Sequence, residues 1–127
     1  MVSYDATTET VTVTVRPVYL DDKSNVLARR FVFAYFVRIE NGGTDAVQLL
    51  RRQWRITDSE GHVQHVEGEG VVGVQPRIAP GEAHEYHSFC ALPTFEGTME
   101  GAYQIEREDG SRLFAQIPRF HLRALAN

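Results

Sequence analysis

The apolar residues of this chain recur with a period of two, and this spacing limits the fold more than any other feature. Val11, Val13 and Val15 alternate with threonine and arginine. Because successive side chains of a strand point to opposite faces, this alternation indicates a half-buried strand. No window of the chain shows a helical period. Strand segments are predicted at 10–17, 29–41, 47–61, 62–68, 82–90, 97–108 and 112–122.

Turn-forming residues separate these segments. Gly42-Gly43, Pro80-Gly81 and Asp109-Gly110 each stand between two strand patterns. About seven strands with a turn every ~10 residues predict an all-β sandwich. The 127 residues have the size of one domain, so we expect a single domain over 1–127. Pro118 predicts that the last strand lies at a sheet edge or ends there.

The segment 47–61 carries the only tryptophan. Leu50, Trp54 and Ile56 share a parity, but Arg52 has the same parity. Either Arg52 lies at the edge of the core, or a bulge shifts the register. Trp54 is expected to be buried among aromatic and apolar residues of both sheets, which are Phe33, Tyr35, Met99 and Tyr103.

Composition excludes several classes of protein. The formal net charge is -4, whereas nucleic-acid-binding domains are usually basic. No apolar run approaches the ~20 residues that span a bilayer, so membrane insertion is not expected. Cys90 is the single cysteine, and the first residues show no charged-then-apolar signal pattern. These features fit a cytoplasmic protein.

The stretch "GEGVVGVQP" contains a G-x-G-x-x-G pattern, which in dinucleotide-binding proteins opens a helix. Two prolines and a glycine follow within a few residues and forbid that helix. Val66 to Pro76 is therefore predicted to be an exposed, non-helical loop. Two interpretations stay open: the loop binds a partner or an anion, or its glycines only allow a sharp chain path. The binding-loop candidates are Gly68, Gly70, Val71, Val72, Gly73, Gln75 and Pro76.

Nearby arginines are the candidates for anion binding. Arg51 and Arg55 share one face of their strand, and Trp54 points to the other. Arg77 follows the glycine-rich stretch. Together with the loop, these three residues offer a site for a small anion or a nucleotide phosphate.

The segment "HEYHSFC" contains residue types found in zinc sites and in nucleophilic catalysis. On a strand, His84 and Cys90 share a face while His87 points the other way. No second pair of ligands completes a tetrahedral set, so no metal and no cofactor are predicted. Neighbours on one strand rarely form a nucleophile–base pair, so Ser88 and Cys90 are interpreted as small residues in or beside the core. The chain is predicted not to be an enzyme.

Four motifs give the chain a resemblance to the ApaG family: Q-L-L-x-R-x-W, G-x-G-V-V-G-x-Q-P, P-G-E and G-x-M-x-G-x-Y. The similarity runs from about Val11 to Leu122. It implies an immunoglobulin-like or fibronectin-type-III-like sandwich and a label linking the family to cobalt and magnesium efflux. Related domains occur in eukaryotic F-box proteins and in a polymerase-delta-interacting protein. His84, Phe89 and Phe95 differ from the family's usual residues.

The resemblance brings no catalytic residues to carry over. With the composition and motifs, it predicts a non-enzymatic binding module that contacts an unknown protein partner. Its link to cobalt and magnesium homeostasis would be indirect. The alternative is binding of a small anion or nucleotide phosphate through the Gly68–Gly73 loop.

Overall fold

A computed structural model describes residues 2–125 of the chain. Within that range the chain forms nine strands and one short 3-10 turn, η1, which covers Asp21–Lys23. The strands are β1 (Tyr4–Thr8), β2 (Val11–Tyr19), β3 (Phe31–Asn41), β4 (Val47–Asp58), β5 (Val63–Glu69), β6 (Arg77–Ile78), β7 (Ala83–Leu92), β8 (Glu96–Arg107) and β9 (Arg112–Arg123).

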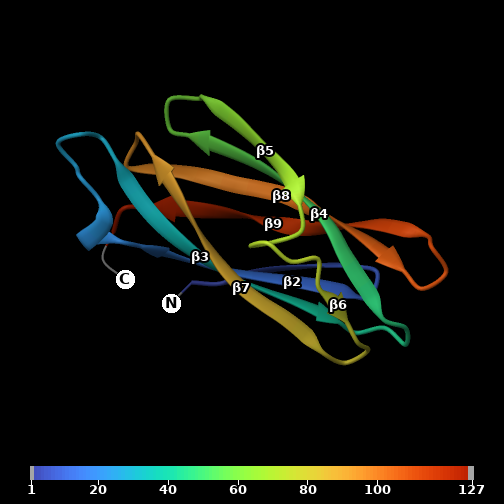
Figure 1. The fold of residues 1–127 in the computed structure, drawn as a ribbon. Coiled ribbons are helices and arrows are strands. Elements are labelled where there is room, and N and C mark those ends of the chain that lie inside the picture. Colours follow the sequence, from blue (N-terminus) through green and yellow to red (C-terminus); the bar gives the residue numbers. More distant parts are fainter. Residues whose placement is uncertain (1, 126–127) are drawn as a thin grey trace.

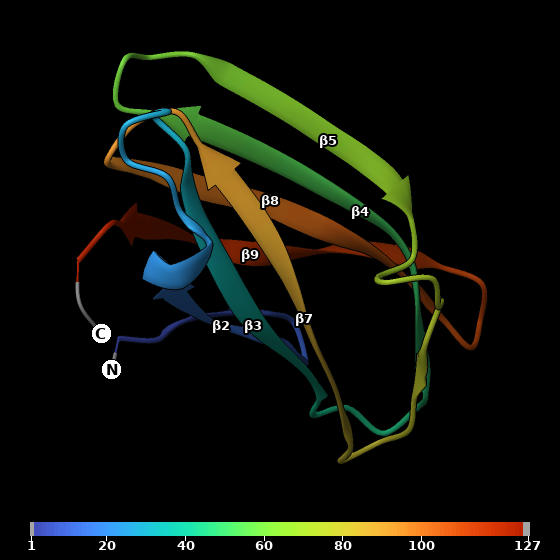
Figure 2. The same ribbon diagram turned by 60° about the vertical axis from the view of Figure 1, so that its left-hand side comes forward.

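The strands form two antiparallel sheets that pack face to face (Figures 1 and 2). One sheet has the order β1-β2-β3-β7, and the other has the order β5-β4-β8-β9 with β6 paired to β4. The predicted all-β sandwich is confirmed. The prediction of about seven strands missed β1 and β6. β6 has two residues, too few to show a period, and no residue of β1 is fully buried.

The alternation on β2 and β3 places one apolar face of each strand in the core. Val11, Val13 and Val15 are fully buried on β2, and the odd-numbered residues from Phe31 to Ile39 are buried on β3. On β4 the pairing with β8 shifts between Leu49 and Arg51. Leu50 is therefore the extra residue of a bulge. Arg52 follows the bulge and shares the parity of Trp54, so it faces inward at the edge of the core and both features expected of this strand are present.

Trp54 lies at the centre of the core with 4% of its surface exposed. Its ring contacts Tyr35 at 5.2 Å, Phe120 at 6.0 Å and Tyr103 at 6.3 Å between ring centroids. The predicted burial and the contacts with Tyr35 and Tyr103 are confirmed. The sequence pattern did not suggest the contact with Phe120, which comes from the last strand.

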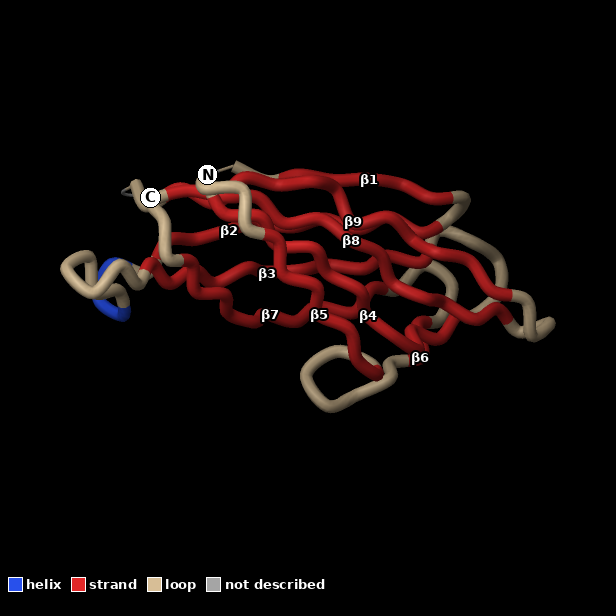
Figure 3. The backbone as a smooth tube through the Cα atoms, turned by 90° about the horizontal axis from the view of Figure 1, so that it is seen from above, coloured by secondary structure: helices blue, strands red, loops and turns tan. Residues whose placement is uncertain are grey.

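The two long sides of the sandwich differ. On one side β1 and β2 pack against β9, and the Gln116 N–H donates to Thr8 Oγ1 at 2.9 Å. On the other side β7 and β5 are the last strands of their sheets, and they do not pair with each other. We call this the open side. The loop that joins β5 to β6 lies here (Figures 2 and 3).

We expect Trp54→Ala to lower the free energy of unfolding by ~3–5 kcal/mol, because truncating a buried aromatic side chain leaves a cavity. Urea unfolding followed by circular dichroism measures the change. Phe114→Ala is the matched control, because Phe114 is 49% exposed on β9. Its cost should stay near ~0.5 kcal/mol. Equal unfolding midpoints for the two variants would contradict this view of the core.

Candidate functional site

A pocket of about 300 Å³ opens between the two sheets on the open side. Its polar lining comes from four strands: Tyr35 on β3, Arg52 on β4, Gln64 on β5, and Ser88 and Cys90 on β7. The remaining lining is apolar and includes Trp54, Met99 and Phe89. The pocket is thus a small cleft with apolar walls and a few polar groups, a form typical of ligand sites.

Arg52 connects this pocket to the glycine-rich loop. Its Nη1 donates to the carbonyl oxygen of Glu69 at 3.0 Å and to that of Gly70 at 3.1 Å. A Cβ atom on Gly68 would lie 2.8 Å from the guanidinium nitrogens, so a side chain there would displace the end of Arg52 from its present position. Arg52 was not among the predicted site residues. The signal that could have identified Arg52 is the parity it shares with Trp54, because this parity places both side chains on the inner face of β4.

Three tyrosines gather beside Arg52. The hydroxyl groups of Tyr86 and Tyr103 form a hydrogen bond, and Tyr35 bonds with Ser88. Burial raises the pKa of Tyr35, Tyr86 and Tyr103, and the nearby Arg52 charge acts in the opposite direction on all three. The phenols therefore stay protonated at neutral pH and supply polar contacts inside the sandwich.

The histidine and cysteine pattern follows the predicted parity. The residues at 84, 86, 88 and 90 of β7 are less exposed than their neighbours, whereas His87 faces outward. Burial raises the pKa of the Cys90 thiol to about 11, so the thiolate needed for nucleophilic attack is scarce at neutral pH. Over residues 2–125 no group of three His, Cys, Asp or Glu side chains is placed to hold a metal ion.

The glycine-rich stretch differs from its prediction in two ways. β5 continues to Glu69, so Val66 to Glu69 belong to a strand and the loop begins at Gly70. The predicted exposure of Val71 is wrong, because Val71 is fully buried in the core. Val72 is 66% exposed, as predicted for this loop.

Three of the six backbone N–H groups of this loop, those of Gly70, Val71 and Val74, donate within the chain. Gly70 N–H donates to the Leu50 carbonyl at 2.8 Å, and the N–H groups of Val71 and Val74 donate to each other's carbonyl oxygens. Gln75 Nε2 also donates to the Leu50 carbonyl, at 3.0 Å, and the loop rejoins β4 where Leu49 N–H donates to the Pro76 carbonyl. Gly70 and Gly73 have positive φ, and Gly70 has no room for a Cβ. These bonds stabilise the path of the chain.

The three predicted anion-binding arginines do not gather around the loop. Arg51 and Arg55 have the parity opposite to the inward-facing Trp54, so they lie on the outer face of β4. Arg55 borders a shallow hollow there that also contains Glu67 and Glu100. Arg77 lies on β6, where its guanidinium is 3.4 Å from Glu108. The charge next to the loop is instead that of Arg52.

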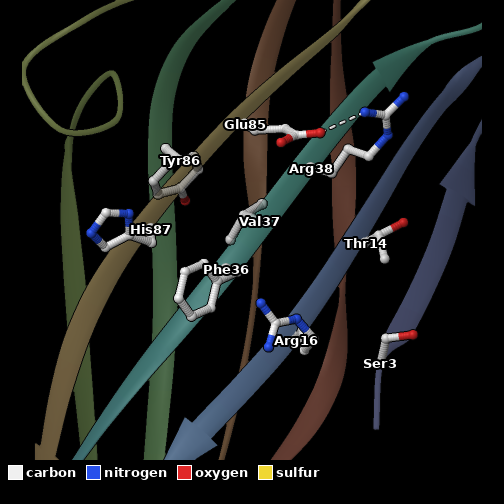
Figure 4. A pocket seen from close by; sticks show the side chains of 9 residues that line it. All are labelled: Ser3, Thr14, Arg16, Phe36, Val37, Arg38, Glu85, Tyr86 and His87. Atoms are coloured by element: carbon white, nitrogen blue, oxygen red, sulfur yellow. Dashed lines mark hydrogen bonds and ion pairs between the residues drawn. The ribbon is translucent and has the colours of Figure 1, made fainter. Parts of the chain in front are cut away.

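The outer face of the β1-β2-β3-β7 sheet carries a row of aromatic rings from β3 and β7. The rings of Phe36 and His87 lie 5.4 Å apart, and those of His87 and Phe89 lie 5.7 Å apart. Figure 4 shows Phe36 and His87 on neighbouring strands, with the Arg16 guanidinium 4.5 Å from the Phe36 ring. A shallow pocket of about 400 Å³ surrounds them, and Phe89 is 56% exposed.

Within the part of the chain that the structure describes, no helix has the length and apolar character needed to cross a membrane.

Comparison with known proteins agrees with the fold. The ApaG domain family matches residues 21–107. Protein ApaG of Paramagnetospirillum magneticum is 54% identical over 119 residues, 94% of this chain and 92% of that protein. Protein ApaG of Thiobacillus denitrificans is 51% identical over 112 residues, 88% of each chain. A Bordetella pertussis crystal structure described as ApaA superposes with a TM-score of 0.87 at 47% identity, covering 89% of this chain and 92% of that chain.

We expect stability to fall at alkaline pH, because buried phenols and the Cys90 thiol hold their protons more tightly in the folded state. For Cys90 the contribution is complete below its unfolded pKa near 9 and is lost as the pH rises towards about 11. Urea midpoints measured from pH ~7 to ~11 report the loss, and Cys90→Ala should make it shallower. A midpoint independent of pH in this window would contradict the burial of these groups.

Proposed function

The chain belongs to the ApaG domain family, and from this premise we propose that it is a non-enzymatic protein-binding module. Its partner supplies an extended segment that pairs with the free edge of β7 on the open side of the sandwich. The addition would extend the β1-β2-β3-β7 sheet by one strand.

The observation that carries this proposal is the unpaired edge of β7. The strand has ten residues, contains neither lysine nor proline, and pairs with β3 on one side only. Lysine, proline and bulges are the usual protection of an edge against further pairing. The edge of β5 carries two charged residues, Glu67 and Glu69, whereas β7 carries one, Glu85, which is paired with Arg38 of the neighbouring strand. β9 carries Pro118 and packs against β1 and β2.

A strand paired with β7 would meet two different surfaces, because its side chains would alternate between the faces of the sheet. One set would lie beside His87 and exposed Phe89 on the outer face. The other set would lie over the pocket between the sheets. The exposed side chains of Val72 and Val74 border the same open side and add apolar surface.

Two other roles were expected from the sequence, a link to metal export and anion binding. A contribution to cobalt or magnesium export would be indirect, through the bound protein. The alternative of anion binding by the glycine-rich loop has less support, because Arg51, Arg55 and Arg77 do not gather around it and three of its six N–H groups already donate within the chain.

Phe89→Ser and Phe114→Ser test the proposal as a matched pair. Both phenylalanines are about half exposed, but Phe89 lies on β7 and Phe114 on the outer face of the other sheet. Tagged wild-type protein and both variants are used to capture partners from a lysate of the source cell. We expect Phe89→Ser to weaken capture of a specific protein by about tenfold or more, and Phe114→Ser to leave it unchanged.

Hydrogen exchange then locates the contact. With the captured protein bound, the β7 amides should exchange more slowly than in the free chain. Protection confined to another surface, or capture that survives Phe89→Ser unchanged, would refute the assignment to β7.

A further inference from the structure

We propose that the pocket beside Arg52 is a subsite for a carboxylate carried on an apolar stem, presented by the segment that pairs with β7. The assignment of the carboxylate to a segment that pairs with β7 rests on the proposed function. The chemical class of the ligand is inferred from the pocket alone.

The charge of Arg52 points to an anionic ligand. Most arginines that form an ion pair in the described chain do so with an exposed glutamate, such as Arg29 with Glu60 and Arg38 with Glu85. The guanidinium of Arg52 is partly buried, and over residues 2–125 it pairs with no carboxylate. Its recorded bonds are those of Nη1 to the Glu69 and Gly70 carbonyls. A partly buried cation beside a cleft is stabilised by an anion that enters the cleft.

The pocket offers no competing negative charge. Among its described lining residues Arg52 is the only charged side chain, because Glu67 and Glu69 alternate with the inward residues of β5 and face outward. The planar fork of a guanidinium matches a carboxylate through two parallel N–H bonds. Nη1 holds the loop, so an incoming carboxylate would bond to the remaining nitrogens of Arg52.

The rest of the lining fits the remainder of such a group. Ser88 and Gln64 are polar side chains that line the pocket near its β7 and β5 edges. Trp54, Met99 and Val66 form apolar walls that suit a methylene stem or an aliphatic side chain. A volume of about 300 Å³ accommodates one side chain or one chain terminus, and it is too small for a dinucleotide.

Two pairs of small probes test the subsite without a known partner. N-acetyl-leucine mimics a chain terminus, and N-acetyl-leucinamide is its neutral control. N-acetyl-glutamate N-methylamide mimics an acidic side chain, and N-acetyl-glutamine N-methylamide is its control. Trp54 is the only tryptophan and lines the pocket, so its fluorescence reports binding. Amide NMR shifts of Ser88 and Cys90 locate it.

We expect at least one acid to bind with amide shifts confined to the pocket, and its neutral control to bind about tenfold more weakly. The acid that binds more tightly identifies the source as a terminus or a side chain. Arg52→Gln should abolish the difference between acid and amide. Arg55→Gln is the matched control, because Arg55 lies three positions along β4 on the outer face and should leave binding unchanged.

The outcomes separate the subsite from the proposed function. Acids that bind no better than their amides to wild-type protein overturn the subsite, whatever the folding of Arg52→Gln. Captured protein that is lost with Phe89→Ser but retained in full with folded Arg52→Gln also overturns the subsite and leaves the proposed function standing. Acid binding at the pocket, without any Phe89-dependent capture, supports the subsite and refutes the proposed function.

Discussion

One extra residue in β4 determines how the open side of this sandwich is built. Leu50 has no partner on β8, and the alternation of β4 changes phase at that point. Val47 and Leu49 before the bulge and Trp54 after it consequently all face the core. The carbonyl of Leu50 is turned away from the β8 ladder and accepts hydrogen bonds from Gly70 N–H and Gln75 Nε2. A local irregularity of one strand therefore anchors the loop that follows β5.

The same change of phase brings a charged residue to the inner face. Arg52 enters the interior because its guanidinium finds two carbonyl acceptors at the end of β5 and three phenols nearby. Gly68 leaves room for this contact, since a side chain there would push the guanidinium away from its present position. A buried or half-buried charge is tolerated only where polar groups surround it. The tyrosine cluster and the glycine-rich stretch are in this sense parts of one arrangement around Arg52.

The contrast between the two sides of the molecule suits a binding role. Where β1 and β2 pack against β9, the apolar surface is covered and the strands contact one another. Where β7 and β5 end their sheets, a cleft and an unpaired edge remain. The sequence of β7 combines an inward polar row with an outward aromatic row, so both faces of an added strand would find complementary contacts.

Local alternation was enough to predict seven of the nine strands, the faces of β2 and β3 and the burial of Trp54, because the period of two follows from the backbone of a single strand. It left the choice at Arg52 open, because bulges are set by pairing with a strand about fifty residues away in the chain. The same pattern led to Arg51 and Arg55, and not Arg52, as the anion-binding candidates. It also predicted that Val71 is exposed, which is wrong because the inner side of a loop depends on the residues that pack beneath it. The sequence by itself determined an all-β chain with two apolar faces to bury. Only the tertiary structure decided which edges stay unpaired and which charge faces the cleft, because both depend on contacts between distant strands.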